Sequence, residues 1–237
     1  MTFFCKSWNS DVSAPVLAGI LFAAVSLFIY PVPQLFCDSQ NVEKLLIFNC
    51  CAGGIFVAFS LALLANTTPY TGIKEKIGIS LPDKKTLLQS LLAAPCLLGV
   101  TALITWHWKY TLNRLDIPFA TKQWMIEQIS CDAPFKLFLI FVLVVIVCPI
   151  AEELIFRRTI FGLAEKAFGA NAAGFITAGI FSAAHSFLAG APGLLIMGLA
   201  FQWIYSRKGN LAASIILHSA CNAITLALAT ASAFYFR

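Results

Sequence analysis

Residues 137–157 read LFLIFVLVVIVCPIAEELIFR, and this stretch decides the fold class. Its first fourteen residues are all apolar, and two adjacent acids and an arginine stand among the residues that follow. The apolar character extends along all 237 residues, of which 59% are hydrophobic and only 11% are charged. A soluble domain carries about 25% charged residues, because polar groups must wet its surface. The sequence therefore excludes a soluble enzyme and a nucleic-acid-binding domain, and it predicts a polytopic membrane protein.

Segments that are long and apolar enough to span a membrane recur along the chain, since a spanning helix needs roughly 20 predominantly apolar residues. They cover residues 14–31, 45–65, 87–106, 135–150, 172–188, 194–205 and 211–234. The less apolar stretch 152–168 is a candidate for an eighth span. We therefore predict an all-α membrane helical bundle of seven or eight transmembrane helices. Residues 117–129 have mixed polarity and predict a short interfacial helix.

The charge balance is basic, with 16 Lys and Arg residues against 11 Asp and Glu residues and a formal net charge of +5. In a membrane protein such an excess reflects basic loops beside anionic lipid. We therefore expect the lipid bilayer as a partner and no nucleic acid. The eight cysteines show no CxxC spacing of the kind that holds a metal ion.

Polar and ionisable side chains form three clusters in the last hundred residues, each beside or inside an apolar segment. They are EELIFR at 152–157, FSAAH at 181–185 and HSACN at 218–222. An ionisable group inside a membrane costs at least a few kcal/mol, so such groups are functional candidates by default.

Helical spacing separates the roles of the two adjacent acids. Glu153 stands four residues before Arg157, in the order that favours an ion pair on one helix face. Glu152 projects about 100° away around the helix. Arg157 is therefore expected to hold Glu153, which leaves Glu152 free to accept a proton as a general base.

The two histidine clusters complete a hydrolytic set. His218 and Asn222 are four residues apart and share one helix face, from which imidazole and carboxamide donors can stabilise an oxyanion. His185 adds a third polar group from another helix, placed to orient or deprotonate water beside Glu152. Because no serine or cysteine has a clear base beside it in the sequence, water is the favoured nucleophile.

Each cluster also has a purely structural interpretation. A Glu–Arg pair in a helix is usually structural, and a lone membrane histidine more often bonds a neighbouring helix. His218 and Asn222 are also the kind of side chains that join membrane helices by hydrogen bonds. The occurrence of all three clusters in order, on consecutive apolar segments, favours a functional site.

The three clusters together resemble the type II CAAX prenyl endopeptidase family, also called CPBP or ABI, of intramembrane proteases and bacteriocin-immunity relatives. The resemblance covers roughly residues 135–228 and rests on the order Glu-Glu-x-x-x-Arg, Phe-x-x-x-His and His-x-x-x-Asn. Relatives commonly have glycine after the motif arginine, whereas this chain has Arg158. We accordingly expect amino-terminal membrane helices and an interfacial segment over residues 1–133, and a CAAX-protease-like catalytic core over 134–237, within one integrated domain.

The resemblance implies that Glu152 and His185 activate the hydrolytic water and that His218 and Asn222 bind the oxyanion. It leaves the cofactor open between none and one divalent metal ion such as zinc. If a metal is used, Glu152, His185 and His218 are its candidate ligands. We favour the metal-free alternative narrowly, because the chain lacks the HExxH signature of zinc proteases.

The expected activity is the cleavage of a peptide or protein substrate at the membrane by an integral, multi-pass endopeptidase. Two alternatives stay open: a non-catalytic binding or immunity protein of the same fold, and a proton-coupled transporter, since membrane carboxylates and histidines also mark ion paths.

The depth of the three clusters depends on the number of spans. Seven spans bring Glu152 level with His218 and leave His185 nearer the opposite face, whereas eight spans bring Glu152 level with His185 and leave His218 lower.

Overall fold

The computed structural model describes residues 42–67, 82–129 and 133–235, and this described part of the chain contains helices and no strand. The helices are α3 (Val42–Thr67), α5 (Lys84–Arg114), α6 (Trp124–Glu127), α7 (Pro134–Phe141), η2 (Val142–Val147), α8 (Cys148–Glu153), η3 (Leu154–Ile160), α9 (Phe161–Ala184), η4 (Leu188–Gly190), α10 (Ala191–Lys208) and α11 (Leu211–Tyr235). The segments η2 and η3 are π-helical, and η4 is a 3₁₀ turn. The all-α prediction is confirmed for these residues, and the predicted span 14–31 lies outside them.

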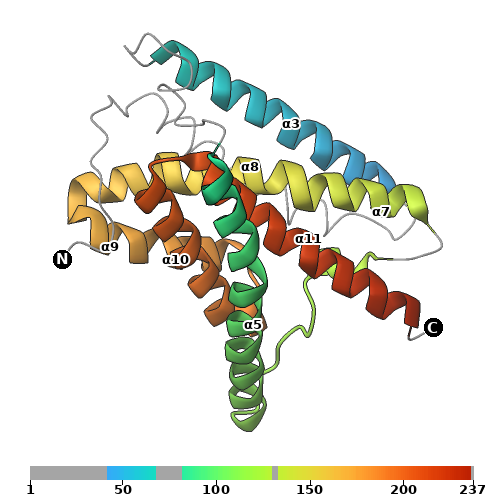
Figure 1. Ribbon diagram of the computed structural model, residues 1–237. Coiled ribbons are helices and arrows are strands. Elements are labelled where there is room, and N and C mark those ends of the chain that lie inside the picture. The colour runs from blue at the N-terminus through green and yellow to red at the C-terminus, as the bar shows by residue number, and fades with distance from the viewer. Residues whose placement is uncertain (1–41, 68–81, 130–132, 236–237) are drawn as a thin grey trace.

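One continuous helix runs from residue 134 to residue 168, through α7, η2, α8, η3 and the first part of α9 (Figure 1). The residues at its internal junctions all keep right-handed helical backbone angles. Its 35 residues extend about 52 Å at 1.5 Å per residue. The helix is therefore longer than the hydrocarbon core of a bilayer, which is about 30 Å thick.

The chain turns back at Gly169. This residue has φ +76° and ψ 162°, a conformation that suits glycine because it has no Cβ atom. The second part of α9 returns along η3, so that the rings of Phe156 and Phe181 meet with centroids 5.1 Å apart. Residues 152–168 therefore continue the helix that begins at Pro134. They do not form a separate antiparallel span.

Four helical stretches of the described chain are long and apolar enough to cross a membrane. They are Lys84–Arg114, Pro134–Ala184, Leu188–Lys208 and Leu211–Tyr235. The predicted span 45–65 lies within helix α3. The spans predicted from residue 87 onward fall on these four stretches, except that the predicted span 172–188 runs past the end of α9 at Ala184. The described residues thus do not confirm the predicted count of seven or eight.

The core of the bundle lies where α5, α10 and α11 meet η3 and α9, while α3 runs alongside α7, η2 and α8 (Figure 1). Helices α5 and α10 approach closely at Gly193, where a Cβ atom would lie 2.5 Å from Oγ1 of Thr105. Small residues allow this approach between membrane helices. Because α5 contributes Ala94 to the same core cluster as Phe181 and Leu217, residues from both halves of the chain build one core.

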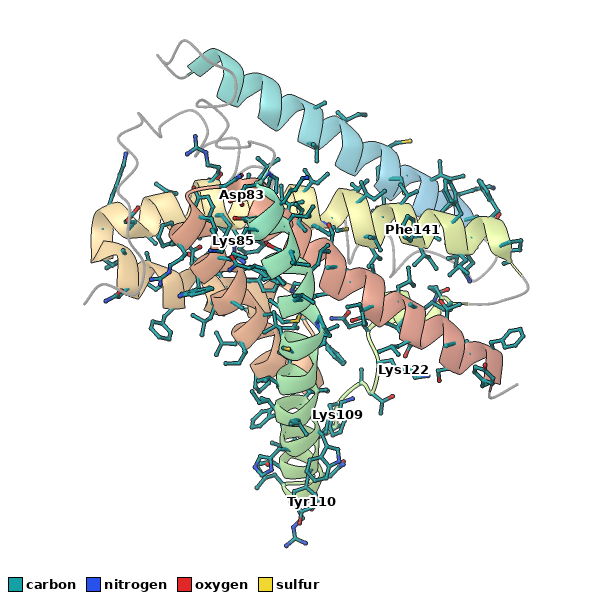
Figure 2. All side chains as sticks on the ribbon, in the orientation of Figure 1. Asp83, Lys85, Lys109, Tyr110, Lys122 and Phe141 are labelled. Atoms are coloured by element: carbon teal, nitrogen blue, oxygen red, sulfur yellow. The ribbon has the colours of Figure 1, made fainter. Side chains whose placement is uncertain are left out.

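Helix α5 begins at a side-chain cap and ends beyond the rest of the bundle. The carboxylate of Asp83 accepts a hydrogen bond from the backbone N–H of Thr86 at 2.8 Å, and bonding to Thr86 holds the pKa of Asp83 below its usual range. Figure 2 shows Asp83 beside the bundle, whereas Tyr110 lies at the far, projecting end of α5. Trp106 is 69% exposed near this end, as expected for an aromatic side chain at the headgroup level.

The predicted interfacial helix over residues 117–129 is much shorter than expected. Only the four residues of α6 (Trp124–Glu127) are helical, and residues 117–123 form an irregular connection. Pro118 lies within this connection and disfavours a helical conformation of the residue before it.

Candidate active site

The three polar clusters of the sequence meet in the core of the bundle. The first lies on α8 and η3, the second lies at the end of α9, and the third lies on α11. Glu152 stands 17 residues before Gly169, and His185 stands 16 residues after it. Because the chain reverses at Gly169, these two residues lie at similar levels along the paired helices. Helix α11 packs on α8 and brings the third cluster to the same region.

Glu153 is the most heavily bonded side chain of the site. It is fully buried, and its Oε2 accepts hydrogen bonds from Nε of Arg157 at 2.9 Å and from the hydroxyl of Ser214. Its Oε1 lies 3.1 Å from Nδ1 of His218. The predicted Glu153–Arg157 ion pair is therefore present, and the carboxylate also binds two residues of α11. A buried carboxylate needs this number of donors to offset its lost hydration.

Arg157 has a second set of contacts besides Glu153. It is 1% exposed, and its guanidinium carbon lies 5.7 Å from the ring centroid of Phe181 and 6.0 Å from that of Phe201. These are cation–π contacts, which strengthen when water is excluded. Both Nη atoms of Arg157 lack a hydrogen-bond partner among the described residues.

His218 has a defined orientation and a defined proton. A carboxylate can only accept, so Nδ1 of His218 carries the hydrogen in its contact with Glu153. The imidazole ring stacks on Phe201 with centroids 4.5 Å apart and planes 22° apart. This arrangement points Nε2 at Glu152, whose Oε2 lies 3.8 Å away. The nitrogen that faces Glu152 is therefore the one that has no hydrogen in the neutral ring.

Glu152 differs from its neighbour as the spacing predicted. Its side chain is 27% exposed, whereas that of Glu153 is 0% exposed. Its Oε2 has no hydrogen-bond partner among the described residues, and the nearest charged or titratable partner is His218. A partly accessible carboxylate with an unused oxygen is the group that can take a proton from a bound water molecule.

His185 contacts the Phe181 ring, which also contacts His218. Its ring centroid is 4.7 Å from that of Phe181, which in turn is 5.9 Å from that of His218. Nδ1 of His185 donates to the backbone carbonyl of Phe181 at 2.8 Å, so Nε2 carries the lone pair. Within the part of the chain that the structure describes, no hydrogen bond or ion pair joins His185 to Glu152.

Asn222 binds a backbone carbonyl that the helix itself cannot satisfy. Its Nδ2 donates to the carbonyl of Val144 at 2.9 Å. In a π-helix each N–H bonds to the carbonyl five residues earlier, and in η2 the N–H of Cys148 bonds to the carbonyl of Leu143. The carbonyl of Val144 would pair in the same way with residue 149, but Pro149 has no N–H. Asn222 therefore replaces the hydrogen bond lost at Pro149. This contact uses one of its two amide hydrogens and leaves the other for a ligand.

Sequence reasoning missed two participants in this network. Ser214 lies four residues before His218 on α11, so the helical spacing that paired His218 with Asn222 contained a signal for it. Phe201 comes from α10, and nothing in its local sequence indicates that it stacks on His218.

The described residues do not fit a catalytic zinc site. A site of that kind needs three protein ligands around an open position, and no group of three His, Cys, Asp or Glu side chains among them is close enough to hold a metal ion. Of the candidate ligands, only Glu152 and His218 approach each other. The Nδ1 atoms of His185 and His218 are bound to protein oxygens, which leaves only Nε2 of each ring available to a ligand.

The helices that carry this network are similar to a known family. Residues 134–224 match the type II CAAX prenyl endopeptidase Rce1-like family. The match begins at the first residue of α7 and includes all three clusters, so the resemblance indicated by the motifs is confirmed. No curated protein and no solved structure matches the chain. The Rce1-like match and the long apolar helices identify an integral, multi-pass membrane protein that is similar to CAAX-protease-like hydrolases.

Proposed function

We propose that this protein is an intramembrane endopeptidase that hydrolyses a peptide bond in a membrane-associated or lipidated protein. One observation carries the proposal: Oε2 of Glu152, which has no hydrogen-bond partner among the described residues, lies 3.8 Å from Nε2 of His218 in the core of the bundle. Glu153 binds the other nitrogen of the ring and keeps it in place. A free carboxylate beside an oriented imidazole is the arrangement expected for activation of water and proton transfer.

In the proposed reaction, Glu152 removes a proton from water while the oxygen attacks the peptide carbonyl carbon. Nε2 of His185 helps to orient the water, because its Nδ1 hydrogen is already bound to the carbonyl of Phe181. The carbonyl oxygen becomes an oxyanion. The proton passes from Glu152 to Nε2 of His218, whose imidazolium then donates to the oxyanion. It returns through Glu152 to the leaving amine nitrogen as the C–N bond breaks, which restores the starting state of the site.

The oxyanion needs donors, and two residues of α11 are proposed to supply them. The second amide hydrogen of Asn222 is free for this role because its first binds Val144. His218 donates from Nε2 only as the imidazolium, since Glu153 holds its Nδ1 hydrogen. Fixed donors in a water-poor site favour the transition state because they need no reorientation as the charge develops.

The proposal is tested by reconstituting purified protein in liposomes with membrane-anchored peptides, with and without a prenyl group. Mass spectrometry of the products is expected to show cleavage at a defined peptide bond by the wild-type protein. The absence of cleavage of every peptide, together with proton flux across the liposomes, would replace the proposal with the transporter alternative.

Chelation separates glutamate-activated water from metal-bound water. If Glu152 and His185 activate the nucleophile without a metal, extensive dialysis against EDTA or 1,10-phenanthroline should leave kcat within about twofold of its starting value. Elemental analysis should find no stoichiometric zinc in the active protein. Loss of cleavage on chelation, restored by added zinc, would contradict the metal-free mechanism and make His185 and His218 candidate ligands.

Asn222→Ala is expected to lower kcat by on the order of 100-fold with little change in KM, because an oxyanion donor acts mainly in the transition state. The same substitution leaves the carbonyl of Val144 without a donor, which costs about 1–3 kcal/mol of stability. Steady-state kinetics on one peptide and thermal melting measure the two effects separately.

A double variant provides the control for Asn222. Pro149→Ala returns a backbone N–H that can bond to Val144, so adding it to Asn222→Ala should recover part of the melting temperature. It should not recover kcat, because the oxyanion donor is still absent. Recovery of both quantities would mean that Asn222 only joins the helices.

A further inference from the structure

Ser214 is a buried serine of α11 that belongs to none of the three sequence clusters. It is 0% exposed, and its hydroxyl donates to Oε2 of Glu153. A serine inside a helix often bonds instead to the carbonyl of its own preceding turn. Two other hydroxyl groups of the same helix follow that pattern, since Thr225 bonds to Cys221 and Thr230 to Leu226. Ser214 is different because its hydrogen goes to a charged group on another helix.

The hydroxyl of Ser214 and Nδ1 of His218 bind different oxygens of Glu153. Oε2 accepts from both Ser214 and Nε of Arg157, which leaves Oε1 for Nδ1 of His218. An arginine and a carboxylate prefer a bidentate pair in which two N–H groups bind the two oxygens. Arg157 has the donors for that arrangement, because both its Nη atoms lack a hydrogen-bond partner among the described residues.

We propose that Ser214 is a positioning residue that prevents Glu153 from turning into a bidentate pair with Arg157. By binding Oε2, Ser214 keeps Oε1 on Nδ1 of His218 and so fixes the ring proton there. Nε2 then faces Glu152 at 3.8 Å in the state that can receive a proton. The catalytic consequence of this arrangement rests on the proposed function, but the position of the proton does not.

Without Ser214, two tautomers of His218 compete. Once Glu153 has turned to Arg157, nothing among the described residues holds the hydrogen on Nδ1, and Glu152 can accept a hydrogen from Nε2 instead. In that tautomer His218 has no lone pair facing Glu152. The active fraction of the protein, and with it kcat, falls with the fraction of His218 that keeps its Nδ1 hydrogen.

The full-length protein labelled with ¹⁵N-histidine tests the inference directly. The chain has only three histidines, so His218→Gln identifies the signals of His218 in the spectrum. The ¹⁵N chemical shifts distinguish a ring protonated at Nδ1 from one protonated at Nε2. We expect the Nδ1–H form in the wild-type protein, and a mixture of the two forms in Ser214→Ala.

Ser90→Ala is the matched control. Ser90 is also a serine of 0% exposure, and it lies on α5 against the same helix, but its hydroxyl donates to the backbone carbonyls of Thr86 and Ala213. This variant loses the same buried hydroxyl without touching Glu153, so its His218 spectrum should match the wild type. Ser214→Cys preserves the size of the side chain with a weaker donor, and it provides the same measurement should Ser214→Ala fail to fold.

The kinetic readout connects the tautomer to turnover. Ser214→Ala should lower kcat by about tenfold when roughly a tenth of His218 keeps the Nδ1 hydrogen, with KM unchanged. A folded Ser214→Ala or Ser214→Cys protein whose His218 keeps the wild-type tautomer overturns the inference. A shifted tautomer in a protein whose wild type cleaves no peptide supports the role of Ser214 and counts against the proposed function alone.

Discussion

Glu152→Gln protein is expected to insert and melt like the wild type and to show no measurable turnover. Glutamine has the size of glutamate but cannot accept the proton of water. A general base contributes about 10²–10⁴-fold to the rate, so kcat should fall by about that factor or more. Folding should be unaffected because Glu152 is 27% exposed and its Oε2 makes no hydrogen bond among the described residues. The measurement is peptide cleavage in liposomes, together with thermal melting of the same preparation.

Glu165→Gln is a suitable control for this substitution. Glu165 is a partly buried acid on α9, close to Gly169 and outside the site network. The same chemical change at this position should leave kcat near the wild-type value. Near-normal cleavage by Glu152→Gln would show that another group activates the water.

Arg157→Ala is expected to have the largest effect on stability, a loss of about 3–5 kcal/mol. It leaves the carboxylate of Glu153 fully buried without its countercharge, and it removes the cation that lies over Phe181 and Phe201. Low yield and a lower melting temperature in detergent are the measurements. Arg207→Ala is the control, because Arg207 is exposed at the end of α10 and its loss should change stability by less than about 1 kcal/mol.

A double variant separates the effect of charge from the effect of packing at Arg157. Glu153→Gln removes the unpaired carboxylate, so adding it to Arg157→Ala should recover part of the lost stability. Equal melting temperatures of the single and double variants would mean that the lost packing of the guanidinium, rather than the buried charge, causes the instability.

The membrane class, the all-α character of the described residues and the Glu153–Arg157 ion pair were predictable from the sequence, because each depends on local properties. Composition and apolar length decide whether a segment belongs in a bilayer. The turn of a helix puts Glu153 beside Arg157 and turns Glu152 away, and both features are present in the structure. The motifs also indicated the family whose model matches residues 134–224.

The turn at Gly169 was not predictable in the same way. The apolar pattern shows no difference between a separate span over residues 152–168 and a continuation of the helix that starts at Pro134. Only the reversal at Gly169 decides this, and it also decides that Glu152 and His185 lie at similar levels. Gly169 is one of 14 glycines, and the sequence does not mark which of them turns the chain.

Tertiary structure alone decided what each polar side chain binds across helices. Ser214 and His218 reach Glu153, and Asn222 reaches Val144, only because α11 packs on η2 and α8 in one register. A shift of one residue along α11 would rotate these side chains by about 100° and move them by about 1.5 Å. Local spacing therefore determined which residues share a helix face, whereas helix packing determined which atoms meet.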